Sequence, residues 1–206
     1  DTTGQSIAEN DDYVALARAM AIKAGYGSAD TTGPIAPENS LAAFAAACEA
    51  GYGIELDVQL TLDGQVVVVH DADLLRVAGD SRLIEDLTYD ELTRIPLFPN
   101  GKSGDLKAEP LPGAGENPPL VVTPSAAPEG YCQHVPLFSD VLDVVAGRAP
   151  LIVEYKFSNN RAWDERSEEL MEKGHALLEA YDGPYVVESF HPGAVNWYKE
   201  DRKSTR

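Results

Sequence analysis

Basic residues are scarce in this sequence: 16 Lys and Arg stand against 34 Asp and Glu among 206 residues, for a formal net charge of -18. This balance argues against nucleic acid or an anionic membrane as a direct partner, because both attract basic surfaces. Long apolar runs are missing as well, since no stretch approaches the ~18 residues of a membrane-spanning helix. We therefore expect no nucleic-acid partner and no direct membrane insertion, and an anionic substrate would need a cation to mediate its binding.

Cysteine is nearly absent, with Cys48 and Cys132 as the only two. They are too few and too far apart for a disulfide framework or a zinc site, and Cys48 lies in an Ala-rich helical pattern typical of a buried free thiol. The N-terminus also lacks the basic and then apolar segments of a secretory signal. These absences favour a reducing, cytoplasmic location. The chain does not begin with Met, so we interpret it as a piece of a longer protein.

Among what is present, the stretch GIELDVQLTLDGQVVVVHD at residues 53–71 is the most informative. A strand turns alternate residues to opposite faces, so Glu55 and Asp57 share one face while the intervening aliphatic residues share the other. One interpretation is an antiparallel hairpin whose polar face meets solvent, with the Asp-Gly pair as its turn. The four valines of Val66–Val69 instead indicate a strand buried on both faces, which would place the two acids in an interior.

Strand and helix patterns alternate in the rest of the chain. A strand pattern at residues 149–157 is followed by an amphipathic helix at 163–181 and a further short strand at 184–190. This order predicts an α/β protein with a parallel sheet of four or five strands, in a single domain over residues 1–206. Residues 98–134 carry many Pro and Gly and little periodicity, so we predict an insertion loop there.

Three acids lie inside the strand patterns, each near a C-terminal strand end: Glu55, Asp57 and Glu154. Burying ionised carboxylates without a partner costs on the order of several kcal/mol each. A hard divalent cation, Ca²⁺ or Mg²⁺, removes this conflict because both ions prefer oxygen ligands. Lys156 shares a strand face with Glu154, and it either forms a salt bridge with one of these acids or contacts a substrate phosphate.

Other polar residues stand where the strands and helices meet loops. His70 ends the valine strand, which makes it the candidate general acid or base. The alternative is a core histidine that Asp71 hydrogen-bonds. Glu38 and Asn39 precede the predicted helix at residues 41–50, and capping that helix is the simpler of their possible roles.

Four segments of the chain resemble the glycerophosphodiester phosphodiesterase family, in family order over residues 34–198: PENSLAAF, GIELDVQLTLDGQVVVVHD, LIVEYK and ESFHP. Enzymes of this family hydrolyse glycerophosphodiesters to glycerol phosphate and an alcohol on a TIM barrel. The resemblance implies a TIM-type (β/α) barrel of parallel strands, incomplete at its C-terminal end. It also implies a small-molecule glycerophosphodiester substrate and a divalent cation, Ca²⁺ or Mg²⁺, as cofactor.

The resemblance further implies a role for each matching residue. Lys156 corresponds to a phosphate contact and His70 to one of two catalytic histidines. Three acids correspond to the metal ligands: Glu55, Asp57 and Glu154. Glu38 and Asn39 correspond to residues that help to hold the mouth of the site.

The sequence departs from the family at the first strand. A His-Arg-Gly motif opens the family pattern, and its best counterpart here is Lys23-Ala24-Gly25, in a stretch at 13–24 that we predict as a short helix running into a weak strand. Lys23 retains a charge for a substrate phosphate, but a lost acid/base group typically costs about 10²- to 10⁴-fold in rate. We therefore expect weak or lost hydrolysis. The alternative is a non-catalytic, cation-dependent module that binds glycerophosphate or a lipid head group, and open barrel edges predict self-association.

Overall fold

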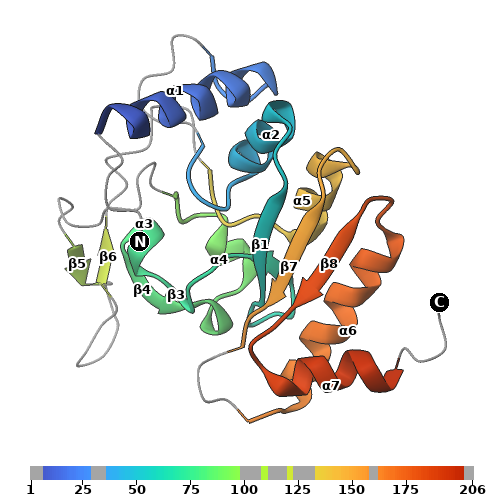
Figure 1. The fold of residues 1–206 in the computed structure, drawn as a ribbon. Coiled ribbons are helices and arrows are strands. Elements are labelled where there is room, and N and C mark those ends of the chain that lie inside the picture. Colours follow the sequence, from blue (N-terminus) through green and yellow to red (C-terminus); the bar gives the residue numbers. More distant parts are fainter. Residues whose placement is uncertain are drawn as a thin grey trace.

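The computed structural model describes residues 7–28, 36–97, 108–110, 120–122, 133–157 and 162–201 (Figure 1). The helices are α1 (Ile7–Lys23), α2 (Leu41–Ala50), α3 (Leu75–Ala78), α4 (Tyr89–Leu92), α5 (Phe138–Val145), α6 (Glu165–Ala180) and α7 (Pro192–Asp201), with a 3-10 turn η1 (Ile84–Asp86). The strands are β1 (Ile54–Leu60), β2 (Val66–Val68), β3 (Asp73–Leu74), β4 (Asp80–Leu83), β5 (Ala108–Pro110), β6 (Leu120–Val122), β7 (Leu151–Tyr155) and β8 (Tyr185–Glu188).

A four-stranded sheet in the order β2-β1-β7-β8 forms the centre of the fold. β1, β7 and β8 run parallel, and α6 connects β7 to β8. β2 returns antiparallel to β1, pairing Val58 with Val68, after a turn in which Gly64 takes the left-handed φ of 73°. Two small antiparallel pairs, β3-β4 and β5-β6, lie outside this sheet.

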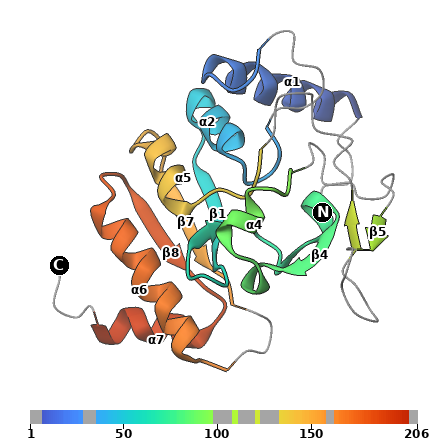
Figure 2. The ribbon, with the colours of Figure 1, turned by 180° about the vertical axis from the view of Figure 1, so that it is seen from behind.

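One face of the parallel strands packs against helices and forms the main core. Seen from behind in Figure 2, α5 and α6 lie over the sheet. Alternation along each strand turns an apolar set to this face, and Leu56, Val153 and Tyr155 are each at most 1% exposed. Helix α5 contributes Phe138, which is fully buried, and burying a side chain of this size stabilises a fold by about 1.5–3 kcal/mol. The opposite face of the same strands carries the polar residues.

The helix that leads into β1 is bounded by local signals in its own sequence. Ser40 caps the N-terminus of α2 by accepting a hydrogen bond from the Ala43 N–H. Gly51 ends the helix in the left-handed conformation at φ 76°, and three residues later the chain enters β1 at Ile54. The end of α2 therefore fixes where β1 starts, and with it which residues face the site.

Each of the two interpretations of residues 53–71 is correct in part. The segment is an antiparallel hairpin, but Val66, Val67, Val68 and Val69 are all 5% exposed or less, so the returning strand is buried on both faces. Val67 and Val69 pack in a second apolar cluster with residues of α3, η1 and α4.

The weak strand predicted within residues 13–24 is wrong, because α1 continues as helix to Lys23. This stretch is rich in alanine and has only two β-branched residues, Val14 and Ile22, so helix propensity prevails. Its small side chains also allow close packing, since Ala21 lies against Ala42 and Ala46 of α2. Most of the predicted 98–134 insertion lies outside the described residues, apart from β5, β6 and residues 133–134. Among the described helices, none has the length and apolar character needed to cross a bilayer.

Candidate active site

A row of acidic side chains crosses the polar face of the sheet. The register aligns Asp57 of β1 with Glu154 of β7, and Glu154 with Glu188 of β8. Glu55 lies two residues before Asp57, on the same face. Carboxylate oxygens of Glu55, Glu154 and Glu188 all lie within 4.8 Å of one another. Three parallel strands thus bring four acids together.

Burial makes Glu55 and Asp57 more difficult to ionise. Asp57 is 3% exposed and Glu154 6% exposed. Burial raises the pKa of Asp57 above its ordinary value, and the neighbouring Lys156 ammonium lowers it only in part. The pKa of Glu55 is also raised, first by burial and then by repulsion from Asp57 and Glu154. The cluster therefore holds more negative charge than its neighbours neutralise.

Lys156 is the cation that the structure places in this cluster. Its backbone N–H donates to the Val58 carbonyl, and its Nζ lies 2.9 Å from Glu154 Oε2 and 3.2 Å from Asp57 Oδ1. Burial lowers the pKa of Lys156, but the hydrogen bond to Glu154 and the attraction of Asp57 outweigh it and leave that pKa raised. The salt bridges considered from the sequence are therefore present. The same Nζ lies 3.5 Å from His70 Nε2, at the edge of the cavity described below.

One buried oxygen tests whether a divalent cation fits. Asp57 Oδ1 is shielded from solvent and accepts no hydrogen bond within the described part of the chain, although Lys156 Nζ is at ion-pair distance. Together with the carboxylates of Glu55, Glu154 and Glu188, it makes a donor set of oxygens alone, which is the set that Ca²⁺ and Mg²⁺ prefer. The residues present fit such an ion.

His70 stands beside the acids because the hairpin backbone is firmly held. The Val69 N–H donates to the Asp57 carbonyl at 3.0 Å. The side-chain amide of Gln59 donates to the carbonyls of Val69, His70 and Asp71 at 2.8 to 3.1 Å. The His70 side chain is 51% exposed, so the interpretation as a core histidine is wrong, although Asp71 Oδ1 does lie 2.7 Å from its Nδ1.

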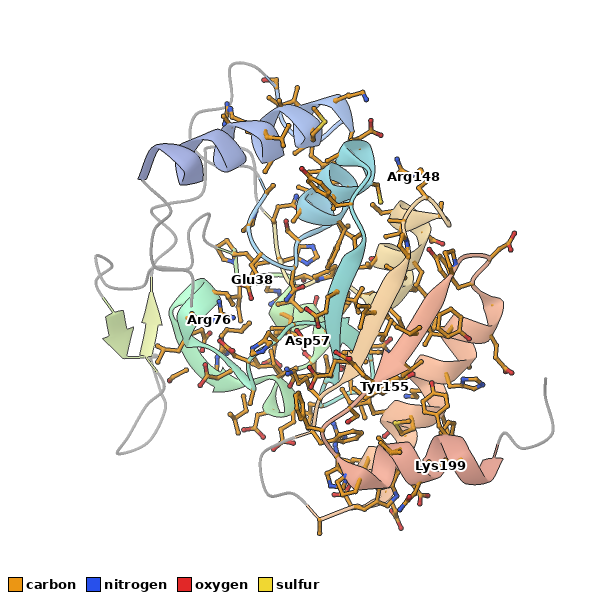
Figure 3. The ribbon with its side chains drawn as sticks, viewed as in Figure 1. Glu38, Asp57, Arg76, Arg148, Tyr155 and Lys199 are labelled. Carbon is orange, nitrogen blue, oxygen red and sulfur yellow. The ribbon has the colours of Figure 1, made fainter. Side chains whose placement is uncertain are left out.

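Glu38 and Asn39 line a cavity at this site. A cavity of about 360 Å³ is lined by Glu38, Asn39, Glu55, Asp57 and His70, together with apolar residues of α2 and β1. Helix capping falls to the adjacent Ser40, so the simpler role expected for the pair is wrong. Figure 3 shows Glu38 and Asp57 in the middle of the molecule, with Arg76 nearby.

Lys23 is not brought to the cluster. Its Nζ lies 2.7 Å from Glu49 Oε2 near the C-terminal end of α2. Arg148, which precedes β7, pairs with the same carboxylate at 3.0 Å. Both cations therefore lie by the segments that enter β1 and β7, and Figure 3 shows Arg148 well away from Asp57. The expectation that Lys23 faces a substrate phosphate finds no geometric support.

Two residues at this site were missed from the sequence. Glu188 was read only as part of a short strand, although its place near the strand end is the signal that singled out Glu154. Arg76, which binds both Glu38 and Asp71, carries no local signal because its partners are distant in the chain or in a loop.

Comparisons with known proteins agree with this geometry. The model of the glycerophosphoryl diester phosphodiesterase family matches residues 27–203. A glycerophosphodiester phosphodiesterase from Bacillus altitudinis is 31% identical over 164 residues, which are 77% of this chain and 55% of that protein. Another from Caldanaerobacter subterraneus subsp. tengcongensis is 47% identical over 60 residues, 29% of this chain and 25% of that protein.

Solved structures extend the comparison to the fold. An Oleispira antarctica phosphodiesterase, in complex with the product sn-glycerol-3-phosphate, matches with a TM-score of 0.57 and 24% identity, over 80% of this chain and 56% of that one. The glycerophosphodiester phosphodiesterase of Thermotoga maritima matches with a TM-score of 0.52 and 24% identity, over 80% of this chain and 53% of that one. The predicted TIM-type architecture is confirmed, with β1, β7 and β8 as neighbouring strands of such a barrel.

The chain spans about half the length of the Bacillus altitudinis and Oleispira antarctica proteins. The family match nevertheless covers most of this sequence and includes every segment on which the resemblance was based. This chain therefore belongs to the glycerophosphoryl diester phosphodiesterase family.

Proposed function

We propose that this chain carries a metal-dependent phosphodiesterase site that hydrolyses glycerophosphodiesters to glycerol phosphate and an alcohol. The observation that carries the proposal is the group of carboxylate oxygens of Glu55, Glu154 and Glu188 within 4.8 Å of one another, beside the buried Asp57, in a member of this family. In the proposal, Glu55, Asp57 and Glu154 hold Ca²⁺ or Mg²⁺, and Glu188 lies close enough to add an oxygen ligand.

Other residues in and beside the cavity act on the substrate in this proposal. A bound divalent cation would supply Lewis-acid polarisation of the phosphate oxygens. Lys156 contacts a phosphate oxygen as a point charge, at the cost of loosening one of its two ion pairs. His70, which lines the cavity, moves a proton at Nε2, the ring nitrogen that contacts Lys156. Glu38 and Asn39 shape the mouth where the glycerol phosphate group enters.

Turnover by this chain is slow in our proposal. The other three histidines have contacts elsewhere. His134 contacts the Val135 carbonyl and the Tyr89 ring, His175 is buried against Trp197 and Tyr198, and His191 packs against aromatic rings. A single imidazole at the site leaves one proton transfer without a dedicated group, which typically costs about 10²- to 10⁴-fold.

The placement of Lys23 favours a second candidate function. With helix in place of the expected first strand, the chain would act as a cation-dependent module that binds glycerophosphate or a lipid head group without hydrolysing it. The acid cluster and Lys156 serve this role equally well, because neither depends on a second histidine.

The experiment that separates the two measures glycerol phosphate released from glycerophosphocholine with Ca²⁺, with Mg²⁺ and with EDTA. Slow release that EDTA and Glu154→Gln both abolish supports the enzyme. Calorimetric binding of glycerol phosphate in the presence of the cation, with no release above the Glu154→Gln background, supports the binding module. Release that persists in both EDTA and the variant would rule out this site as its source.

A further inference from the structure

Arg76 joins two separate segments at the mouth of the cavity. Its Nη1 and Nη2 donate to Glu38 Oε2 and Oε1 at 2.6 and 2.8 Å, a bidentate pairing. Its Nε donates to Asp71 Oδ2 at 2.6 Å. Glu38 precedes α2 and Asp71 follows the β2 strand, so a single planar guanidinium ties these two loops together.

The contact with Asp71 extends to His70. Asp71 uses Oδ2 for Arg76 and Oδ1 for His70 Nδ1, the latter at 2.7 Å. Rotation of the carboxylate to release the imidazole would therefore break the Arg76 contact as well. An ionised carboxylate only accepts hydrogen bonds, so this pairing assigns the ring proton to Nδ1. His70 Nε2 is then the unprotonated ring nitrogen, and it accepts a hydrogen bond from Lys156 Nζ at 3.5 Å.

The charges of the network support this assignment. Hydrogen bonds from Arg76 lower the pKa of Glu38 despite its partial burial. Burial raises the pKa of Asp71, but the hydrogen bonds from Arg76 and His70 outweigh it and leave that pKa lowered. Both carboxylates therefore stay ionised at neutral pH, which their ion pairs with Arg76 require.

Exposure indicates that the network does more than stabilise the fold. The side chains of Arg76 and Glu38 are 44% and 47% exposed. Surface ion pairs of this kind typically contribute only about 0–1 kcal/mol to folding. The main consequence of the network is therefore the orientation of the His70 ring, because the direction of its Nε2 depends on how Asp71 is held.

We propose that Arg76 is a positioning residue that clamps Asp71 to Glu38 and thereby fixes the ring orientation and the Nδ1–H tautomer of His70. The inference rests on the proposed function only in giving His70 a role, and its first test requires no turnover. Arg76 lies within the residues that the family model matches, but outside the motif segments considered above.

The test is NMR of the chain labelled with ¹⁵N in its histidine rings, at a pH about two units above the ordinary histidine pKa of about 6.5, where the ring is neutral. A His70→Gln variant assigns the His70 signals. We expect Nδ1–H to dominate in the unmodified chain. Arg76→Met should lower the Nδ1–H to Nε2–H ratio about fivefold, which corresponds to one hydrogen bond of about 1 kcal/mol. Arg76→Lys should give a ratio between those of the unmodified chain and Arg76→Met, because an ammonium keeps the charge but not the parallel N–H donors of the guanidinium.

Arg148→Met is the matched control. Arg148 is also 44% exposed and also pairs with a glutamate, but at the opposite end of the strands. We expect it to leave the His70 tautomer ratio unchanged. An Arg76→Met variant that is folded by circular dichroism and keeps the original ratio would overturn the proposal, and so would an Nε2–H form in the unmodified chain.

Kinetics separate this inference from the proposed function. If glycerophosphocholine is hydrolysed, Arg76→Met should lower kcat while leaving KM within about twofold, with Arg76→Lys recovering part of the loss. Absence of hydrolysis with the expected tautomer change would refute the enzyme and retain the clamp. Hydrolysis with a tautomer ratio that Arg76→Met leaves unchanged would support the enzyme and refute the positioning role of Arg76.

Discussion

Removing the Lys156 ammonium should expose how strongly the acid cluster depends on a cation. Lys156 Nζ lies within 3.2 Å of both Asp57 and Glu154, whose exposed fractions are 3% and 6%. Losing one partner of a buried ion pair typically costs about 3–5 kcal/mol, because the other charge stays buried. The Lys156 side chain is 22% exposed, so water can replace part of the lost interaction. We therefore expect Lys156→Met to lower the free energy of unfolding by about 3 kcal/mol.

The assay is urea denaturation at pH 7 in EDTA, followed by circular dichroism. Lys173→Met is the control, since Lys173 forms an i,i+4 pair with Glu169 and is 45% exposed. Its loss should cost less than about 1 kcal/mol. If Lys156→Met costs no more than this control, Asp57 and Glu154 do not depend on Lys156 and the reasoning is refuted.

Added cation should reverse the defect. An ion that binds only the folded chain stabilises it by about 2.7 kcal/mol at a concentration of 100 times its Kd. We expect Ca²⁺ or Mg²⁺ to stabilise Lys156→Met at least as much as the unmodified chain, because the variant cluster carries one more uncompensated negative charge. A variant that gains no stability from either ion would contradict a cation site at these carboxylates.

The remaining predictions concern individual residues. Glu188→Gln should weaken Ca²⁺ binding by about tenfold in calorimetry, because it removes one carboxylate from the ligand cluster; unchanged affinity would exclude Glu188 as a ligand. The double variant Lys23→His, Ala24→Arg should leave glycerophosphocholine hydrolysis within about twofold, since Lys23 pairs away from the acids; a large gain would mean that α1 can reach them. The pKa of Asp71 is lowered, so its contribution to stability is present above its ordinary pKa and is lost as pH falls through the folded value. Arg76→Met should flatten this loss in urea titrations between pH 7 and pH 3, and an equally steep loss would contradict it.

Local alternation was sufficient to find the centre of the site. The period of two along a strand places Glu55 with Asp57, and Glu154 with Lys156, without knowledge of the sheet. The valine run likewise predicted a buried strand, and four residues at 5% exposure or less confirm it. These features depend on neighbours in the chain, so the sequence is enough to predict them.

Pairing between strands could not be predicted in the same way. Glu188 joins the row because β8 pairs with β7 in the register that aligns it with Glu154, and no local pattern sets that register. The contact of Arg76 with Glu38 spans 38 positions and depends on how two loops meet. The apolar pattern at residues 13–24 was expected to be a short helix running into a weak strand, but its alanine content favours the helix that the structure has.

The central claim is that the carboxylates on the polar face of β1, β7 and β8 form one divalent cation site. Isothermal titration of Ca²⁺ and of Mg²⁺ into the chain, and into a Glu55→Gln, Glu154→Gln double variant, tests it most directly. The account predicts one saturable site for at least one of the ions in the unmodified chain, and loss of that site in the variant. Absence of binding by the unmodified chain, or equal binding by the variant, would contradict the account.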